Sequence, residues 1–503
     1  MSGLRQRRGA GAERGGGGGA AAGTAGTAQG STANSHSKTA ANPATGSGPR
    51  THPRTTLAVL TLIYALFAAV LVVVYRRYGL HFFTPLALRR VTLARGEASY
   101  EAEGSVEAFL REHEFVFVAG VHRSGTTLMA QLLAEHPRVG GLGTDGAPRP
   151  PSDFDEGMFV QSVIPLFGIS AEGLQSARLP GGERAQLGLG RWAHSPTAHI
   201  TERRADLLTP AQQAKLLGEW AFFWNTSLPV LLEKSPPNIM WARYLAAAAT
   251  PPSQLWPKGA ACDDGLGAAQ ASCDNAPPPI GAESATEAIA EHSRAKFVLM
   301  KRHPIAVALA HWQLGACKDL SVRQLVEHWL LQMDTIKCDA GIPPPDDMDL
   351  NFTSLLDPNE EVEGQAERSA EVFCARARAA GVADVPALGV PAPLKGRVFF
   401  ASLEGLARSP LALRILSIQL GLDKGGTGKD SGGSSLAQAH ERLVKAEPPN
   451  AKYATQYDEL LASSDEAREA HAHMIAELGD AVKQHGYDLA DAALAERTSD
   501  EAM

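Results

Sequence analysis

The segment FVFVAGVHRSGTTLMAQLLAEH, residues 115–136, decides the fold class of this chain. Its first residues are apolar and predict a buried strand, and TTLMAQLLAEH predicts the helix that follows. Between them, Gly120 and Gly125 allow the backbone to curl around an anion, and the free N–H groups at the start of the helix point toward the same place. The segment therefore predicts a strand, an anion-binding loop and a helix in direct succession.

The spacing of this loop matches the phosphate loop GxxxxGK[ST] of ATP- and GTP-binding proteins, except that Thr126 stands where the lysine belongs. Because that lysine reaches the β- and γ-phosphates, its absence argues against nucleoside triphosphate chemistry. A nucleotide with a short 5′ anion remains compatible with the loop, and the alternative is a glycine-rich turn without a ligand. The candidate anion ligands are Gly120, His122, Arg123, Ser124, Gly125, Thr126 and Thr127.

Three further apolar segments predict buried strands, each followed by a helix: residues 230–235, 296–301 and 397–405. Buried strands that alternate with helices imply a parallel sheet covered on both faces. We therefore predict an α/β fold, a parallel sheet flanked by helices, with its ligands at the carboxyl ends of the strands.

The N-terminal region has the composition of a membrane-anchored protein. Residues 1–54 are rich in Gly, Ala, Ser, Thr and Arg and predict a disordered tail, or alternatively a transit peptide. Residues 55–75 are apolar and uncharged, long enough for one transmembrane helix. Residues 76–113 are predicted to form a stem. More arginines follow the span than precede it, which favours a cytoplasmic C-terminal part, whereas the sequons at Asn225 and Asn351 favour a lumenal one.

The rest of the chain is predicted to form one catalytic domain and a C-terminal extension. The domain covers residues 114–457, with a Pro-, Gly- and Ala-rich insertion at about 250–293 and a flexible loop at about 423–436. Residues 458–503 are rich in Ala and Glu and predict a helical segment.

Charge and cysteine content narrow the possible partners. The formal net charge is −8, which does not favour a nucleic-acid partner. None of the five cysteines forms a CxxC pair, so we expect no metal site. Two pairs are close enough in sequence to bridge in an oxidising compartment, Cys262 with Cys273 and Cys317 with Cys338.

The loop HRSGTTLM resembles the 5′-phosphosulfate loop of sulfotransferases, especially the tyrosylprotein and Golgi types. Four further stretches are similar to a broad sulfotransferase family of plants, algae and bacteria: DEGMFVQ at 155–161, LLEKSPPNIMWARYL at 231–245, KRHPIAVALAHW at 301–312 and HWLLQM at 328–333. The resemblance extends over residues 115–457, outside the insertions. It implies 3′-phosphoadenosine-5′-phosphosulfate (PAPS) as co-substrate and a single-pass Golgi enzyme with a lumenal catalytic domain.

The resemblance also assigns roles to individual residues. Arg302 is expected to bind the 3′-phosphate, although Ala310 replaces the serine that usually helps it. Arg123 and Lys234 are expected to stabilise the transferring group. Glu156 is the candidate catalytic base. Asp155 and the histidines His122, His303 and His328 are further candidates for the catalytic base. Glu404 is expected to have a structural role.

The predicted reaction is sulfuryl transfer from PAPS to an acceptor hydroxyl on a glycan. Protein tyrosine is the alternative acceptor. A kinase-like phosphate-loop enzyme and a catalytically inactive nucleotide-binding membrane protein are the alternative functions.

Overall fold

The computed structural model describes residues 103–144, 147–150, 155–169, 187–256, 282–314, 317–342, 363–386, 392–423, 433–444, 448–491 and 494. The predicted tail and the predicted transmembrane segment at 55–75 lie outside these residues, as do 76–102 of the predicted stem. Within the described ranges, no helix is both long and apolar enough to cross a membrane.

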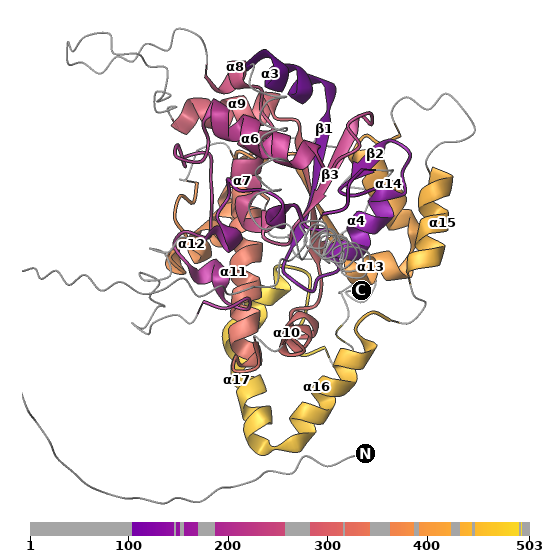
Figure 1. Cartoon of the computed structure of the whole chain (residues 1–503). Coiled ribbons are helices and arrows are strands. Elements are labelled where there is room, and N and C mark those ends of the chain that lie inside the picture. Colours follow the sequence, from indigo (N-terminus) through magenta and orange to yellow (C-terminus); the bar gives the residue numbers. More distant parts are fainter. Residues whose placement is uncertain are drawn as a thin grey trace, which may run out of the picture. The chain divides into compact units, whose positions relative to one another are not determined.

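A five-stranded parallel sheet forms the centre of the fold, in the order β2-β3-β1-β4-β5 (Figure 1). The predicted α/β class is therefore confirmed. The strands are β1 (Glu114–Gly120), β2 (Val139–Gly141), β3 (Val230–Lys234), β4 (Ala295–Lys301) and β5 (Val398–Ser402). Four of them, β1, β3, β4 and β5, correspond to the strands predicted at 115–121, 230–235, 296–301 and 397–405. The short strand β2, Val-Gly-Gly, has too few apolar side chains to give a periodic signal.

Alternate side chains of each strand point to opposite faces of the sheet, and each face has its own apolar core. Phe115 and Phe117 of β1 belong to the larger core, in which Phe117 stacks on Phe297 with ring centroids 5.4 Å apart. Val116 and Val118 belong to the smaller one. Because both faces are covered, the strands are apolar throughout rather than alternating with polar residues.

Helices cover both faces (Figure 1). The larger core receives side chains from α3 (Glu103–Glu112), α6 (Pro210–Ala221), α7 (Asn238–Ala248), α8 (Pro252–Leu255), α9 (Ala282–His292), α10 (Pro304–Trp312), α11 (Val322–Ala340), α16 (Ala451–Ser463) and α17 (Asp465–Lys483). The smaller core receives side chains from α4 (Thr126–Ala134), α13 (Leu403–Arg408), α14 (Pro410–Gln419) and α15 (Gly433–Leu443). Helix α12 (Glu363–Ala379) packs against α11, and short 3-10 turns occur at Gly157–Phe159, Leu166–Gly168 and Trp192–His194.

The folded region extends beyond 114–457 at both ends. Helix α3, which lies within the predicted stem, buries Val106, Phe109 and Leu110 in the larger core. At the other end, α17 buries Met474 and Val482 in the same core. The predicted insertion at 250–293 also begins and ends with ordered helices, α8 and α9, and its residues 257–281 lie outside the described part of the chain.

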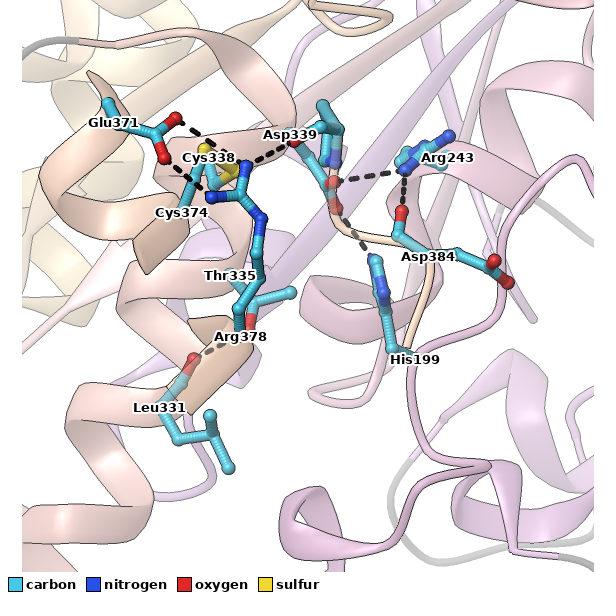
Figure 2. Close-up of a disulfide and its surroundings, with 11 residues drawn as sticks. His199, Arg243, Leu331, Thr335, Cys338, Asp339, Glu371, Cys374, Arg378 and Asp384 are labelled. Atoms are coloured by element: carbon cyan, nitrogen blue, oxygen red, sulfur yellow. Dashed lines mark hydrogen bonds and ion pairs between the residues drawn. A yellow bond between two sulfur atoms is a disulfide. The ribbon is translucent and has the colours of Figure 1, made fainter. Parts of the chain in front are cut away.

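A disulfide joins Cys338 of α11 to Cys374 of α12 (Figure 2). The suggested pair Cys317–Cys338 is therefore wrong, and Cys317 is a buried free thiol. Cys317 precedes α11, whereas Cys338 lies near the C-terminal end of that helix. At 1.5 Å per residue, the helix between them holds the two thiols roughly 20 Å or more apart. A disulfide requires Cα atoms within about 7 Å. Cys262 and Cys273 lie outside the described residues.

Candidate active site

The β1–α4 loop has the conformation that its glycines require. Gly120 has φ 147°, and a Cβ atom there would lie 2.6 Å from the Met300 carbonyl oxygen on β4. Arg123 has φ 73° and an exposed side chain, and Gly125 has φ 97° immediately before α4. No side chain caps the start of α4. The loop therefore leaves the first N–H groups of α4 free for an external acceptor.

Lys234 ends β3 directly beside this loop. Its backbone is in register with Val118 of β1, two residues before Gly120. The side chain is buried, and Nζ lies 3.0 Å from Glu156 Oε1. Burial raises the pKa of Glu156, and the Lys234 charge counteracts that effect. The structure thus brings together two predicted site residues that are 78 positions apart in sequence.

Glu233, the neighbour of Lys234, holds the Glu156 segment in place. Its Oε1 accepts from the Gly157 N–H (2.9 Å) and from the Ser235 hydroxyl (2.6 Å), and its other oxygen accepts from Asn238. Burial raises the pKa of Glu233 to about 7. Ser235 Oγ in turn accepts from the Met158 N–H at 3.0 Å. Sequence reasoning missed this support, although the Glu-Lys-Ser order at a strand end was visible.

Arg302 follows β4 and ties the loop to the C-terminal segment. Its guanidinium donates to the Arg123 carbonyl (3.0 Å), to Asn450 Oδ1 (2.8 Å) and to the Pro449 carbonyl (2.7 Å). It also lies over the ring of Tyr453, 4.8 Å from the centroid. Desolvation lowers the pKa of Arg302. The Tyr453 side chain is a further hydrogen-bond partner of this guanidinium.

Glu404 has the structural role that its position predicts. It lies in the first turn of α13, where a carboxylate is favourable. Its oxygens accept from the His303 N–H (3.0 Å), from Asn450 Nδ2 (2.6 Å) and from the Tyr487 hydroxyl (3.2 Å). Glu404 therefore fixes the turns that carry Arg302.

The reserve residues for the catalytic base differ in their surroundings. His303 is fully buried, with Nε2 donating to the Asp488 carbonyl and Nδ1 accepting from the Ile305 N–H, so both nitrogens are occupied. His328 is buried and accepts from the Ala193 N–H. Asp155 is exposed. His122 lies in the loop, and its pKa is lowered to about 3 by desolvation and by His311, Lys234 and Arg123.

The carboxyl ends of three adjacent strands therefore form one site. The loop follows β1, Lys234 ends β3 with Glu156 against it, and Arg302 follows β4. Among the residues described here, no group of three or more His, Cys, Asp or Glu side chains is placed to hold a metal ion.

Comparison with known families identifies the region that carries this site. Residues 116–254 match a family model described as the sulfotransferase family. This part of the chain is similar to that family. The sulfotransferase region contains the loop, Glu156 and Lys234, whereas Arg302 lies beyond the match. Sulfuryl transfer is the general reaction that this similarity supports. No curated protein matches the chain.

Proposed function

We propose that this chain transfers a sulfuryl group from PAPS to an acceptor hydroxyl on a glycan. The observation that carries the proposal is the buried Lys234–Glu156 pair beside the β1–α4 loop, within the sulfotransferase region. A cation and a carboxylate at this place provide the two functions that the reaction requires, stabilisation of the leaving group and removal of a proton.

The residues of the loop fit a 5′-phosphosulfate. The uncapped start of α4 offers free N–H groups, and Arg123 and Thr127 are exposed beside it. Ser124 Oγ is buried and has no hydrogen-bond partner within the described part of the chain. A buried hydroxyl without a partner is costly, and an anion oxygen would satisfy it. Gly120, Gly125 and the two threonines complete the predicted donor site.

The reaction is a single displacement at sulfur. The acceptor oxygen forms a bond to sulfur, the bond between sulfur and the 5′-phosphate oxygen breaks, and adenosine 3′,5′-bisphosphate leaves. Glu156, whose pKa burial raises, takes the hydroxyl proton. Lys234 and Arg123 offset the negative charge on the sulfuryl and phosphate oxygens. The planar guanidinium of Arg302 is suited to the 3′-phosphate, and its bond to the Arg123 carbonyl connects the two ends of the nucleotide site.

Lys234→Met tests the assignment. In the full-length chain purified in detergent, with labelled PAPS and a mixed acceptor panel, we expect turnover to fall about 10²–10³-fold. Binding of adenosine 3′,5′-bisphosphate should change far less. Lys318→Met, at an exposed lysine, is the matched control. Wild-type turnover in Lys234→Met would remove this residue from the mechanism. Phosphoryl transfer from ATP without PAPS binding would favour the kinase-like alternative.

We further propose a lumenal catalytic domain, anchored in a Golgi membrane by residues 55–75. A buried disulfide such as Cys338–Cys374 is typical of an oxidising compartment. The sequon residue Asn225 is half-buried directly before an exposed turn, and its Oδ1 accepts from the Ser227 hydroxyl at 2.7 Å. Both observations oppose the arginine distribution around the span. Glycosidase treatment should increase the mobility of the wild-type chain, whereas Asn225→Gln should remove that site. Reduced Cys338 and Cys374 in cells would contradict a lumenal position.

A further inference from the structure

Four histidines gather beside the loop with two large aromatic side chains. The histidine cluster consists of His122, His194, His311, His328, Phe167 and Trp192. Ring centroids of His122 lie 5.8 Å from Phe167, 6.3 Å from Trp192 and 6.4 Å from His311. His194 and His328 are 5.8 Å apart. The loop after β1, two 3-10 turns and helices α10 and α11 therefore converge on one place.

Buried polar atoms without a partner are concentrated here. Within the described residues, seven such atoms outside the anion-binding loop's own donor set belong to the cluster or its immediate sequence and hydrogen-bond neighbours: His122 Nδ1, Arg191 Nε, Trp192 Nε1, His194 Nδ1 and Nε2, His311 Nε2 and Gln332 Oε1. Buried donors and acceptors in proteins are nearly always paired, and each unpaired one costs free energy. A concentration of them beside a reactive site indicates a polar partner that binds there.

His311 shows that the cluster is preset for such a partner. Its Nδ1 donates to the Val307 carbonyl at 2.8 Å, one turn earlier in α10. Nδ1 therefore carries the hydrogen, and the buried Nε2 presents a bare lone pair. His194 has no partner for either ring nitrogen among the described residues, so it offers one donor and one acceptor. The two histidines together offer hydrogen-bond acceptors and a donor, and a hydroxyl group uses both kinds of partner.

The number of unpaired atoms distinguishes the acceptor classes. One hydroxyl has one hydrogen and two lone pairs, so a tyrosine phenol can satisfy at most three of these atoms. A sugar ring carries several hydroxyls, and its apolar face can pack on Phe167, which is only partly buried. We infer that the histidine cluster is the acceptor subsite and that it binds a carbohydrate through several hydroxyl groups at once. This inference rests on the proposed sulfuryl transfer.

The charge state of the cluster agrees with an uncharged hydroxyl ligand. Desolvation lowers the pKa of His194 and of His311 to about 4, and positive neighbours act in the same direction. The rings are therefore neutral near pH 7, and each neutral ring keeps one donor and one acceptor. A protonated cluster would offer only donors.

His194→Phe and Trp192→Phe test the inference. His194→Phe removes unpaired buried polar atoms but keeps an aromatic ring, so its melting temperature should stay the same or rise. Trp192→Phe leaves a cavity in the core and should lower the melting temperature. The KM for a polysaccharide acceptor should increase at least about 10-fold, since a site that has lost its polar partners binds hydroxyls poorly. The dissociation constant of adenosine 3′,5′-bisphosphate should stay within about 2-fold, because these residues do not form the donor loop. His473→Ala, at an exposed histidine of α17, is the control.

Three outcomes would overturn the acceptor subsite. The first is an unchanged acceptor KM in both variants. The second is a fall in the melting temperature of His194→Phe by more than about 4 °C, which would mean that the His194 side chain already has partners in the free protein. The third is transfer to tyrosine peptides with an equal effect of His194→Phe. Binding of neutral oligosaccharides, measured by saturation-transfer NMR, tests the acceptor subsite independently of sulfuryl transfer. Sugar binding that His194→Phe abolishes supports the subsite even if no sulfuryl transfer occurs.

Discussion

Two buried polar clusters of this protein contrast in how their atoms are paired. One surrounds Asp339 at the end of α11, next to the Cys338–Cys374 disulfide (Figure 2). The other is the histidine cluster beside the β1–α4 loop. In the first cluster, every charged group has a partner. In the second, several ring nitrogens have none within the described residues.

The cluster at Asp339 is a closed ionic network. His199 donates from Nδ1 to the Ala383 carbonyl (2.7 Å) and from Nε2 to Asp339 (2.8 Å), so its ring carries both protons. Arg243 pairs with both oxygens of Glu202 and reaches Asp339 at 3.5 Å. It also donates to the Asp384 carbonyl. Two cations and two anions thus neutralise each other among side chains from distant parts of the chain.

The difference indicates what each cluster is for. A network that is complete in the free protein stabilises the fold and has no capacity for a ligand. A cluster with unpaired buried polar atoms lowers the stability of the free protein, and that loss is offset only when a ligand pairs with these atoms. The two clusters should therefore respond in opposite ways to mutation and to pH.

Breaking the closed network should have the largest effect on stability. Asp339→Ala leaves His199 and Arg243 without their shared carboxylate, and we expect a loss of about 3–5 kcal/mol in the free energy of unfolding from urea melts. Asp206→Ala removes an exposed partner of Arg204 and should cost less than about 1 kcal/mol. Equal effects of the two variants would abolish the distinction between a closed network and a surface pair.

Removal of the disulfide should come next. The bridge closes a loop with a sequence separation of 36 residues, so Cys338→Ser with Cys374→Ser should cost about 2–4 kcal/mol. Cys317→Ala removes a thiol without a cross-link and serves as the control. An unchanged free energy of unfolding would show that other contacts, such as the Arg376–Asp334 ion pair at 2.6 Å, suffice to hold α11 against α12.

The pH dependence of stability should have opposite signs in the two clusters. His194 has a pKa of about 4 in the folded state against 6.5 when unfolded, so its neutral form stabilises the fold above pH 6.5 and that contribution is lost as pH falls toward 4. In His199 the pKa is raised, because Asp339 outweighs desolvation, so its contribution is lost as pH rises. We expect urea melts at pH 5, 7 and 9 to separate the two. His194→Phe should reduce the loss in the free energy of unfolding between pH 7 and pH 5 by about 1 kcal/mol. His199→Gln should reduce the loss in the free energy of unfolding between pH 7 and pH 9. The same sign for both variants would contradict this assignment.

The smallest change in stability is expected for His194→Phe at pH 7, where the free energy of unfolding should stay within about 0.5 kcal/mol of wild type or increase. His199→Phe, the matched substitution in the closed network, should be strongly destabilising because it leaves Asp339 without its cation. If both cost the same, the histidine cluster is a structural element like the network at Asp339.

The local part of the site was predictable because it is encoded by neighbouring residues. Glycines at fixed spacing between an apolar strand and a helix specify the loop wherever the rest of the chain lies. The predicted strand at 230–235 ends at Lys234, which placed this lysine at the same carboxyl-end edge of the sheet as the loop after the strand at 115–121. In contrast, the contact of Glu156 with Lys234 depends on a segment without periodic structure, and no local pattern reveals that Glu233 and Ser235 hold it.

The sequence by itself determined the α/β class, four of the five strands and the order of the candidate site residues. These follow from short-range physics: apolar side chains must be buried, and glycine permits the turns that other residues resist. Tertiary structure alone decided the Cys338–Cys374 pairing, the closed network at Asp339 and the gathering of the histidines. Each of these joins residues from distant segments, and their distance in space depends on how the helices pack across the sheet.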